Sequence, residues 1–269
     1  NNVNNKDFVK RLPTATTRLD LNQNKVAAFK NLNIRRAISL AINRQALTKD
    51  VLEDGSTPLK GFVPSGMGNN PTTKQAFYQE AYVKNAVAYN LKEAKKLLNK
   101  GYKETNTKEL KFTILTADTD SSKQAVEFLQ SALEKLPGVS VNVSTIPFVQ
   151  LIAKQQAGNY QASIKTWQSV FADPINFLDI YESNSSYNNS GWQSKKFDSL
   201  LNEAENTYGN QPAKRWQKLV AAEKELMDQQ GTIPLYQVAK SQLLRSNVKN
   251  VVYNPAGVPY DWKDTYIAK

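Results

Sequence analysis

The chain has 269 residues, of which 40% are hydrophobic and 10% aromatic, and it carries 35 Lys and Arg against 24 Asp and Glu. This length supports one large domain or two of ordinary size, with a core that needs neither a metal nor a crosslink for stability. The composition is that of a globular chain, and no apolar run approaches the roughly 18 residues that a bilayer-spanning helix requires.

The sequence contains no histidine and no cysteine. These two residue types supply most of the nucleophiles, bases and zinc ligands that work at neutral pH. Their absence excludes histidine-dependent serine triads, cysteine proteases, His or Cys zinc sites, thiol redox centres and c-type haem attachment. Chemistry that needs only carboxylates, Lys, Tyr or Ser survives this exclusion. We predict no catalytic residues, metal or cofactor, and a cysteine-free chain is also compatible with an oxidising exterior.

The formal net charge is +11, which would attract nucleic acid, an anionic membrane or a cell-wall surface. The basic residues occur in scattered pairs, without a run of five and without an RNA-binding signature. This distribution favours a solvated basic face with no nucleic-acid partner. A basic surface-adhesion or nucleic-acid-binding module stays open as the alternative function, and strong salt dependence of binding would distinguish it.

The first part of the chain predicts a strand and a helix. Residues 16 to 21 alternate and are rich in β-branched side chains, as in a strand. Asn33 is the expected N-cap of a helix that continues to about Thr48. Its buried stripe would consist of Ile34, Ala37, Ile38, Ala41 and Ile42.

A long loop and a shorter helix are expected next. Residues 54 to 73 are rich in glycine and proline but lack the order of a phosphate-binding loop, so they predict an irregular connection. Asn90 is typical of an N-cap, and the helix over residues 91 to 100 is expected to end at Gly101.

The pattern then becomes regular and predicts a β-α-β-α-β run. The expected elements are a strand over 110–116, a helix over 122–136, a strand over 139–143, a helix over 149–156 and a strand over 162–167. Such a run forms a sheet with parallel pairs covered by helices, and ligands gather at the carboxyl ends of its strands. The remaining expected elements are helices over 196–206 and 212–229 and strands over 233–238 and 242–244.

Two acidic pairs are candidate sites. Asp118 and Asp120 have the spacing that begins a calcium loop, but the glycine and glutamate that such a loop needs further on are missing. Helix N-capping is the better interpretation, so no metal is predicted. A hydrolase that uses paired carboxylates stays open as an alternative, and its first candidates are Asp173 and Asp179, which flank the third strand end. An acid before a proline, such as Asp173, is more often a turn or helix-start residue.

The segment from 167 to 192 combines aromatic and uncharged polar side chains. This composition suits a flexible polar ligand such as a peptide. Phe177 and Tyr181 stand four residues apart and are expected in the core. Trp167 and Trp192 are expected to line a cleft.

Residues 31 to 44 read NLNIRRAISLAINR. This segment resembles one found in the extracytoplasmic oligopeptide-binding proteins of peptide ABC importers, solute-binding protein family 5, and it is the most specific of four matches. The other three follow in family order: GFVP at 61–64, YNLKEAKKLL at 89–98 with Gly101-Tyr102, and DPINFL at 173–178. The resemblance covers roughly residues 16 to 267.

This resemblance implies an α/β fold: a periplasmic-binding-protein-like (type II) lobe with a mixed sheet covered by helices, plus strands that return to a missing first lobe. The implied division is a crossover segment over 1–22, the second, ligand-binding lobe over 23–245 and a returning tail over 246–269. The export signal, the lipid-anchored cysteine and most of the first lobe are expected upstream of this chain.

The function implied by the resemblance is the capture of oligopeptides outside the cell and their delivery to the membrane permease of an ABC importer. The protein is expected to be a monomer, with its parent lipid-anchored to the cell membrane of a Gram-positive bacterium. Its expected partners are oligopeptides and the permease.

The chain departs from the family at its ligand-end clamps. Val170 stands where some members have an aspartate for the ligand's amino terminus, and Gln155 and Ile164 stand where some have arginines for its carboxylate. Recognition is then expected to depend on main-chain hydrogen bonds and aromatic walls. The expected ligand contacts are Phe148, Trp167, Ser169, Phe171 and Trp192.

Overall fold

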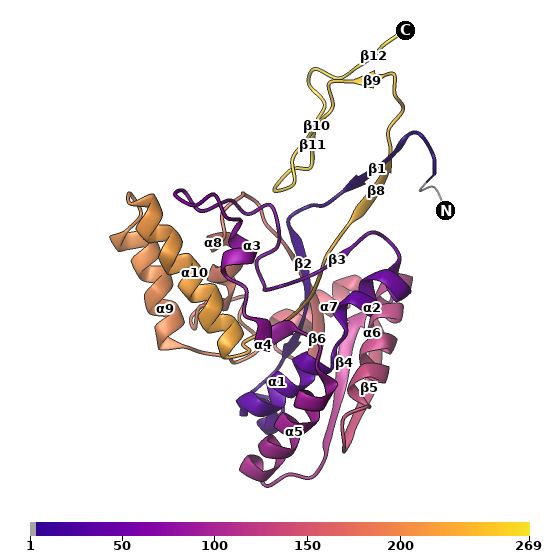
Figure 1. Cartoon of the computed structure of the whole chain (residues 1–269). Coiled ribbons are helices and arrows are strands. Elements are labelled where there is room, and N and C mark those ends of the chain that lie inside the picture. The colour runs from indigo at the N-terminus through magenta and orange to yellow at the C-terminus, as the bar shows by residue number, and fades with distance from the viewer. Residues whose placement is uncertain (1–3) are drawn as a thin grey trace.

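A computed structural model describes residues 4–269. Its centre is a six-stranded mixed sheet with the strand order β3-β7-β2-β6-β4-β5, covered by helices (Figure 1). The strands are β2 (Ala15–Leu21), β3 (Thr57–Pro58), β4 (Leu110–Ala117), β5 (Val139–Ile146), β6 (Ala162–Gln168) and β7 (Ile233–Gln237).

The predicted β-α-β-α-β run is confirmed. Strand β4 pairs in parallel with both β5 and β6, and the crossovers are helices α6 (Asp120–Leu133) and α7 (Phe148–Gln156). Strand β2 pairs antiparallel with β6 along its whole length. Strand β2 lies between β7 and β6, so residues 15–21 are an interior strand of the six-stranded sheet.

The other helices are α1 (Leu32–Ala41), α2 (Arg44–Ala46), α3 (Phe77–Glu80), α4 (Lys84–Val87), α5 (Leu91–Thr105), α8 (Ile175–Leu178), α9 (Lys195–Asn202) and α10 (Pro212–Asp228). Short 3₁₀ or π turns occur over Ala27–Lys30, Leu47–Leu52, Asp179–Tyr181 and Glu203–Thr207. Among residues 4–269, no helix is both long and apolar enough to cross a membrane.

Helix α1 differs from the prediction at both ends. Its N-cap is Asn31, whose side chain accepts a hydrogen bond from the backbone N–H of Ile34, whereas Asn33 lies in the first turn and donates to Glu104. The helix ends at Ala41 instead of Thr48. The buried guanidinium of Arg44 donates to the carbonyls of Ser39 and other residues near this end, which provides partners for groups that a continuing helix would have paired.

Helix α5 is longer than predicted. Asn90 caps it as expected, but the helix continues through Gly101 and ends at Thr105, before the left-handed Asn106. A Cβ at Gly101 would stand 2.5 Å from Cγ1 of Ile34 on α1. The glycine therefore permits close packing of α5 on α1 rather than ending the helix.

Alternation along the strands gives the sheet two different faces. One face carries the largest core, which includes Leu19 of β2, Phe112 of β4 and Ile164 of β6, packed against α1, α5 and α6. The next residue along each strand points to the opposite face. That face receives Arg18 and Asp20 from β2, and Lys165 and Trp167 from β6.

A second core joins α8, α9 and α10 to Phe62, Val63 and Met67, which lie in the loop over 54–73. The loop over 54–73 is irregular as predicted, apart from the two residues of β3. Strands β1 (Phe8–Arg11) and β8 (Lys240–Leu243) form an antiparallel ribbon, followed by the small strand pairs β9–β12 and β10–β11. Figure 1 shows the ribbon and the yellow tail projecting from the helix-covered body.

Candidate functional site

Trp167 lies at the carboxyl end of β6, where the sequence predicts a ligand cleft. The side chain is half-buried, and its indole N–H donates to the carbonyl of Asn176 over 2.7 Å. Its ring meets Tyr187 edge to face, with centroids 5.0 Å apart. The two aromatic rings form a wall with a hollow on each side, because both line the two hollows described next.

We call the first the cationic hollow. It has a volume of about 150 Å³ and is lined by Arg18, Ile152, Gln155, Gln156, Lys165, Thr166, Trp167, Tyr187 and Asn189. The second, the acidic hollow, has about 450 Å³ and is lined by Trp167, Val170, Asn176, Asp179, Ile180, Glu182, Ser185, Ser186 and Tyr187. The wall thus separates two spaces of opposite charge.

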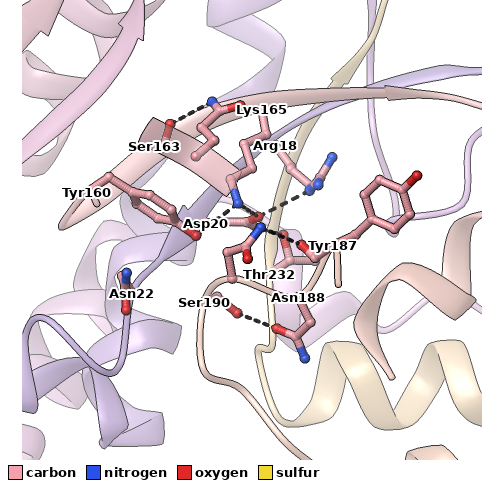
Figure 2. A network of polar contacts seen from close by, with 12 residues as sticks. Arg18, Asp20, Asn22, Tyr160, Ser163, Lys165, Tyr187, Asn188, Ser190 and Thr232 are labelled. Atoms are coloured by element: carbon pink, nitrogen blue, oxygen red, sulfur yellow. Dashed lines mark hydrogen bonds and ion pairs between the residues drawn. The ribbon is translucent and has the colours of Figure 1, made fainter. Parts of the chain in front are cut away.

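Behind the cationic hollow lies a buried polar cluster (Figure 2). The Asp20 carboxylate stands 3.4 Å from Nε of Arg18 and 3.4 Å from Nζ of Lys165. It also accepts hydrogen bonds from the hydroxyls of Tyr181 (2.6 Å) and Thr232 (2.7 Å). These four partners come from strands and turns that are far apart in the sequence.

The pKa values in this cluster follow its contacts. Burial would raise the pKa of Asp20, but Arg18, Lys165 and the two hydroxyls together hold it below its ordinary value. Burial lowers the pKa of Lys165, partly offset by Asp20. Burial would also lower the pKa of Arg18, but Tyr181 and Asp20 raise it above its ordinary value. Arg18 and Asp20 are therefore charged at neutral pH.

The acidic hollow contains carboxyl groups with the opposite shift. Burial, with a smaller contribution from Glu205, raises the pKa of Asp179 to about 6. Burial followed by neighbouring acids raises the pKa of Glu182. One carboxylate oxygen of Asp179 is buried without a hydrogen-bond partner. A positively charged group in this hollow would favour the ionised form of both acids.

The expected ligand contacts separate into exposed and buried residues. Phe148, at the start of α7, is 64% exposed and Phe171 is 48% exposed, so both rings are accessible. Ser169 is buried; its hydroxyl bonds with that of Thr14, and its backbone N–H and C=O are also paired. The two phenylalanines and Trp167 can touch a ligand directly, whereas Ser169 is enclosed by the protein.

Trp192 has a different position from the one we expected. It is only 3% exposed and belongs to the second core, where its ring packs edge to face on Phe197 and Tyr181. A Cβ on Gly231 would stand 2.8 Å from the indole, so this packing is tight. We therefore correct the expectation that Trp192 faces the cleft: Tyr187 stands beside Trp167 instead.

The first acidic pair lies at the start of a helix, and Asp173 of the second pair lies in an ion pair. Residues 4–269 contain no group of three or more acids that could hold a metal ion. The N-cap of α6 is Thr119, whereas we predicted Asp118 or Asp120, and Asp120 is the first residue of that helix. Asp173 forms a two-point ion pair with Arg215, at 2.8 and 3.1 Å, and its side chain accepts from the backbone N–H of Ile175.

Sequence reasoning missed Arg18, Asp20 and Lys165. The available signal was the presence of charged side chains within two strands, ATTRLDL over 15–21 and ASIKTWQ over 162–168, whose other residues are all uncharged. A charge in such a strand is expensive to bury unless it is paired, so each of the three indicates a partner elsewhere in the fold.

The sequence matches the bacterial extracellular solute-binding proteins, family 5 Middle, over residues 1–189. It is 32% identical to a dipeptide-binding protein of Lactococcus lactis over 243 residues, covering 89% of this chain and 44% of the relative. It is 28% identical to the oligopeptide-binding protein OppA of Bacillus subtilis over 235 residues, covering 86% of this chain and 41% of that protein.

Solved structures give the same result. The peptide-bound OppA of Listeria monocytogenes superposes with a TM-score of 0.88 at 33% identity, covering 100% of this chain and 52% of that one. The substrate-binding domain of an oligopeptide ABC transporter from Bacillus anthracis gives a TM-score of 0.90 at 29% identity, covering 100% of this chain and 52% of that one.

The chain thus spans about two fifths of the length of the curated relatives it matches, and about half that of the solved chains. These matches confirm the expected type II binding-protein fold, with its mixed sheet covered by helices. On this evidence the chain belongs to family 5 of the bacterial extracellular solute-binding proteins.

Proposed function

We propose that the chain is the peptide-binding part of an ABC importer component, which captures oligopeptides outside the cell and delivers them to a membrane permease without chemical turnover. The observation that carries the proposal is the wall formed by Trp167 and Tyr187 at the end of β6, with a hollow on each side, in a fold of this family. Aromatic surfaces beside polar hollows suit a peptide whose side chains vary.

The proposed contacts are Trp167, Phe148 and Phe171, because these aromatic side chains are accessible and border the end of β6 or the start of α7. Ser169 and Trp192 support this surface from behind. Ser169 joins the end of β6 to Thr14 and to Gly257 of the tail, and Trp192 fills the core beneath.

Closure over the peptide needs a second wall, and we propose that a further lobe supplies it. The ribbon of β1 and β8 is the proposed connection. Strand β1 leads into β2 and β8 follows β7, and β2 and β7 are neighbours in the main sheet, so the ribbon extends away from one place on that sheet. The lobe proper would then comprise the main sheet, including β2, with its helices. The proposal includes a monomeric protein held outside the cell by a lipid anchor on its parent.

Calorimetric titration with a peptide mixture tests the function. Trp167→Ala in the parent protein is expected to weaken peptide binding by about 1 to 3 kcal/mol, the range for loss of an aromatic anchor. The melting temperature should fall less than for a fully buried aromatic residue, because Trp167 is only half-buried. Tyr89→Ala is the control, since Tyr89 is 48% exposed and lines a separate hollow between α1 and α5.

Intact affinity in Trp167→Ala, together with a large loss of stability, would remove this residue from the site. The salt series tests the alternative of a nucleic-acid or adhesion module. Peptide binding should change little between low and moderate salt, whereas contacts with a polyanion would weaken by orders of magnitude.

A further inference from the structure

The cationic hollow has an excess of positive charge. Arg18 and Lys165 both line it, and none of the residues that line it in the described chain is an acid. Asp20 stands behind the two cations and neutralises one of them. With both cations protonated, the three side chains therefore carry a net charge of +1 next to a hollow of about 150 Å³.

The strand register explains why this charge is fixed in place. Arg18 and Lys165 are direct partners across the β2–β6 pair, and two like charges in that position repel each other. Asp20, two residues along β2, lies on the same face and reduces the repulsion. The hydroxyls of Tyr181 and Thr232 also donate to Asp20, so this carboxylate is fully engaged.

Arg18 retains unused hydrogen-bonding capacity. The residue is only 4% exposed, its Nε contacts Tyr181 and Asp20, and its Nη1 is buried and has no hydrogen-bond partner among residues 4–269. A buried, unpartnered donor on a charged group is costly unless a ligand or water satisfies it. Figure 2 shows Tyr187 of the aromatic wall on the Arg18 side of the cluster.

We propose that the cationic hollow is a carboxylate subsite, in which Arg18 and Lys165 receive a carboxylate group of the bound peptide. The inference rests on the proposed function and narrows its ligand to peptides that carry a carboxylate at this position. The group can be the peptide's terminal carboxylate or the side chain of Asp or Glu. The positive charge of the cationic hollow comes from Arg18 on β2 and Lys165 in the middle of β6. Gln155, which also lines the hollow, is uncharged.

The first experiment changes the ligand and leaves the protein intact. A pentapeptide containing one glutamate, recovered from a random library by the parent protein, is compared with its carboxyl-terminal amide, its Glu→Gln version and the version with both changes. We expect either the amide or the Glu→Gln change, but not both, to weaken binding by roughly tenfold to a hundredfold, the range for a hydrogen-bonded charge. The peptide with both changes should bind as weakly as the sensitive single version. The sensitive change identifies which carboxylate is used.

Equal affinity of all four peptides would overturn the subsite and leave the peptide-binding function standing. Failure of the parent to retain any peptide from the library would overturn the proposed function itself, and the subsite with it. The two failures are therefore distinguishable.

The second experiment changes the charge of the hollow at its rim. Asn189 lines the cationic hollow and makes only one side-chain hydrogen bond, to the carbonyl of Tyr187, so Asn189→Asp preserves the buried cluster. Ser186→Asp is the matched control, because the exposed Ser186 adds the same charge to the acidic hollow, beyond the aromatic wall. Melting temperatures verify that both variants fold.

We expect Asn189→Asp to weaken binding of the carboxylate-bearing peptide by roughly tenfold, because the new carboxylate repels that of the peptide at short range. Binding of the amidated Glu→Gln peptide, which has neither carboxylate, should change little. Ser186→Asp should not weaken binding of the carboxylate-bearing peptide. An equal loss in both variants, or a loss in Asn189→Asp that is the same for both peptides, would contradict a carboxylate in the cationic hollow.

Discussion

Two buried carboxylates in this protein show how the surroundings of a charge decide its behaviour. Asp20 and Glu223 are 2% and 1% exposed, respectively. Asp20 has two cations and two hydroxyl donors around it. Within the described part of the chain, Glu223 on α10 accepts only from the backbone N–H groups of Phe62 and Val63, and its second oxygen has no partner there.

Their pKa values accordingly move in opposite directions. Burial raises the pKa of Glu223 to about 7, because the two backbone donors offset only part of the desolvation. The partners of Asp20 overcome the same burial and lower its pKa. Burial alone therefore predicts neither the charge of a group nor its contribution to stability, and the number of opposite charges in contact decides both.

The largest effect is expected when the cation-paired carboxylate is removed. Asp20→Asn leaves Arg18 and Lys165 facing each other, buried and without their counterion, so we expect the free energy of unfolding at pH 7 to fall by about 3 to 5 kcal/mol. Urea denaturation measures the change. A loss below about 1 kcal/mol would show that the cluster is solvated or rearranges freely.

Glu223 should make stability depend on pH in the neutral range. Because its folded pKa of about 7 exceeds the ordinary 4.5, the folded state binds the extra proton, and stability falls as pH rises from about 4.5 to 7. The free energy of unfolding is expected to fall by about 3 kcal/mol over this pH range. Glu223→Gln keeps an acceptor for Phe62 and Val63 but cannot ionise, so this slope should disappear.

Asp20 provides the contrasting pH window. Its lowered pKa contributes stability above the ordinary value of 3.8, and this contribution is lost as pH falls through the folded pKa. For Glu223→Gln, the free energy of unfolding should therefore vary less between pH 4.5 and 7 than it does for the wild type. Both proteins should still lose stability below pH 3.8. The same neutral slope in both proteins would contradict an ionising Glu223.

A smaller effect is expected at one of the hydroxyl partners of Asp20. Thr232→Val preserves side-chain shape but removes the 2.7 Å hydrogen bond to the carboxylate. We expect a loss of about 1 to 3 kcal/mol, because the acceptor is charged and buried. A double-mutant cycle with Asp20→Asn isolates the pairwise part, and additive losses would show that the bond contributes nothing.

The smallest effect is expected at a surface ion pair. Lys111 and Glu109 are 3.0 Å apart and about two thirds exposed. Glu109→Gln should change the free energy of unfolding by less than about 1 kcal/mol, since water screens the pair and competes for both groups. A loss as large as that of Asp20→Asn would remove the distinction between buried and exposed pairs.

Local sequence pattern determined most of the elements. The strand over 139–143, the helix that begins near residue 122 and the cap at Asn90 each depend on residues a few positions apart, and the structure contains all three, as β5, α6 and the N-cap of α5. The β-α-β-α-β run and the family resemblance likewise follow from short segments in order. Trp167 was placed at the end of its strand by the same local pattern.

Tertiary structure decided the rest, because those contacts join distant parts of the chain. Gly101 lies inside a helix, where its missing side chain leaves room for Ile34, and Trp192 is buried against Phe197 and Tyr181. Arg18 meets Lys165 through strand pairing across 147 positions. A sequence gives the chemistry of each residue, but the local electric field of a site is fixed only when folding brings distant charges within a few ångströms of each other.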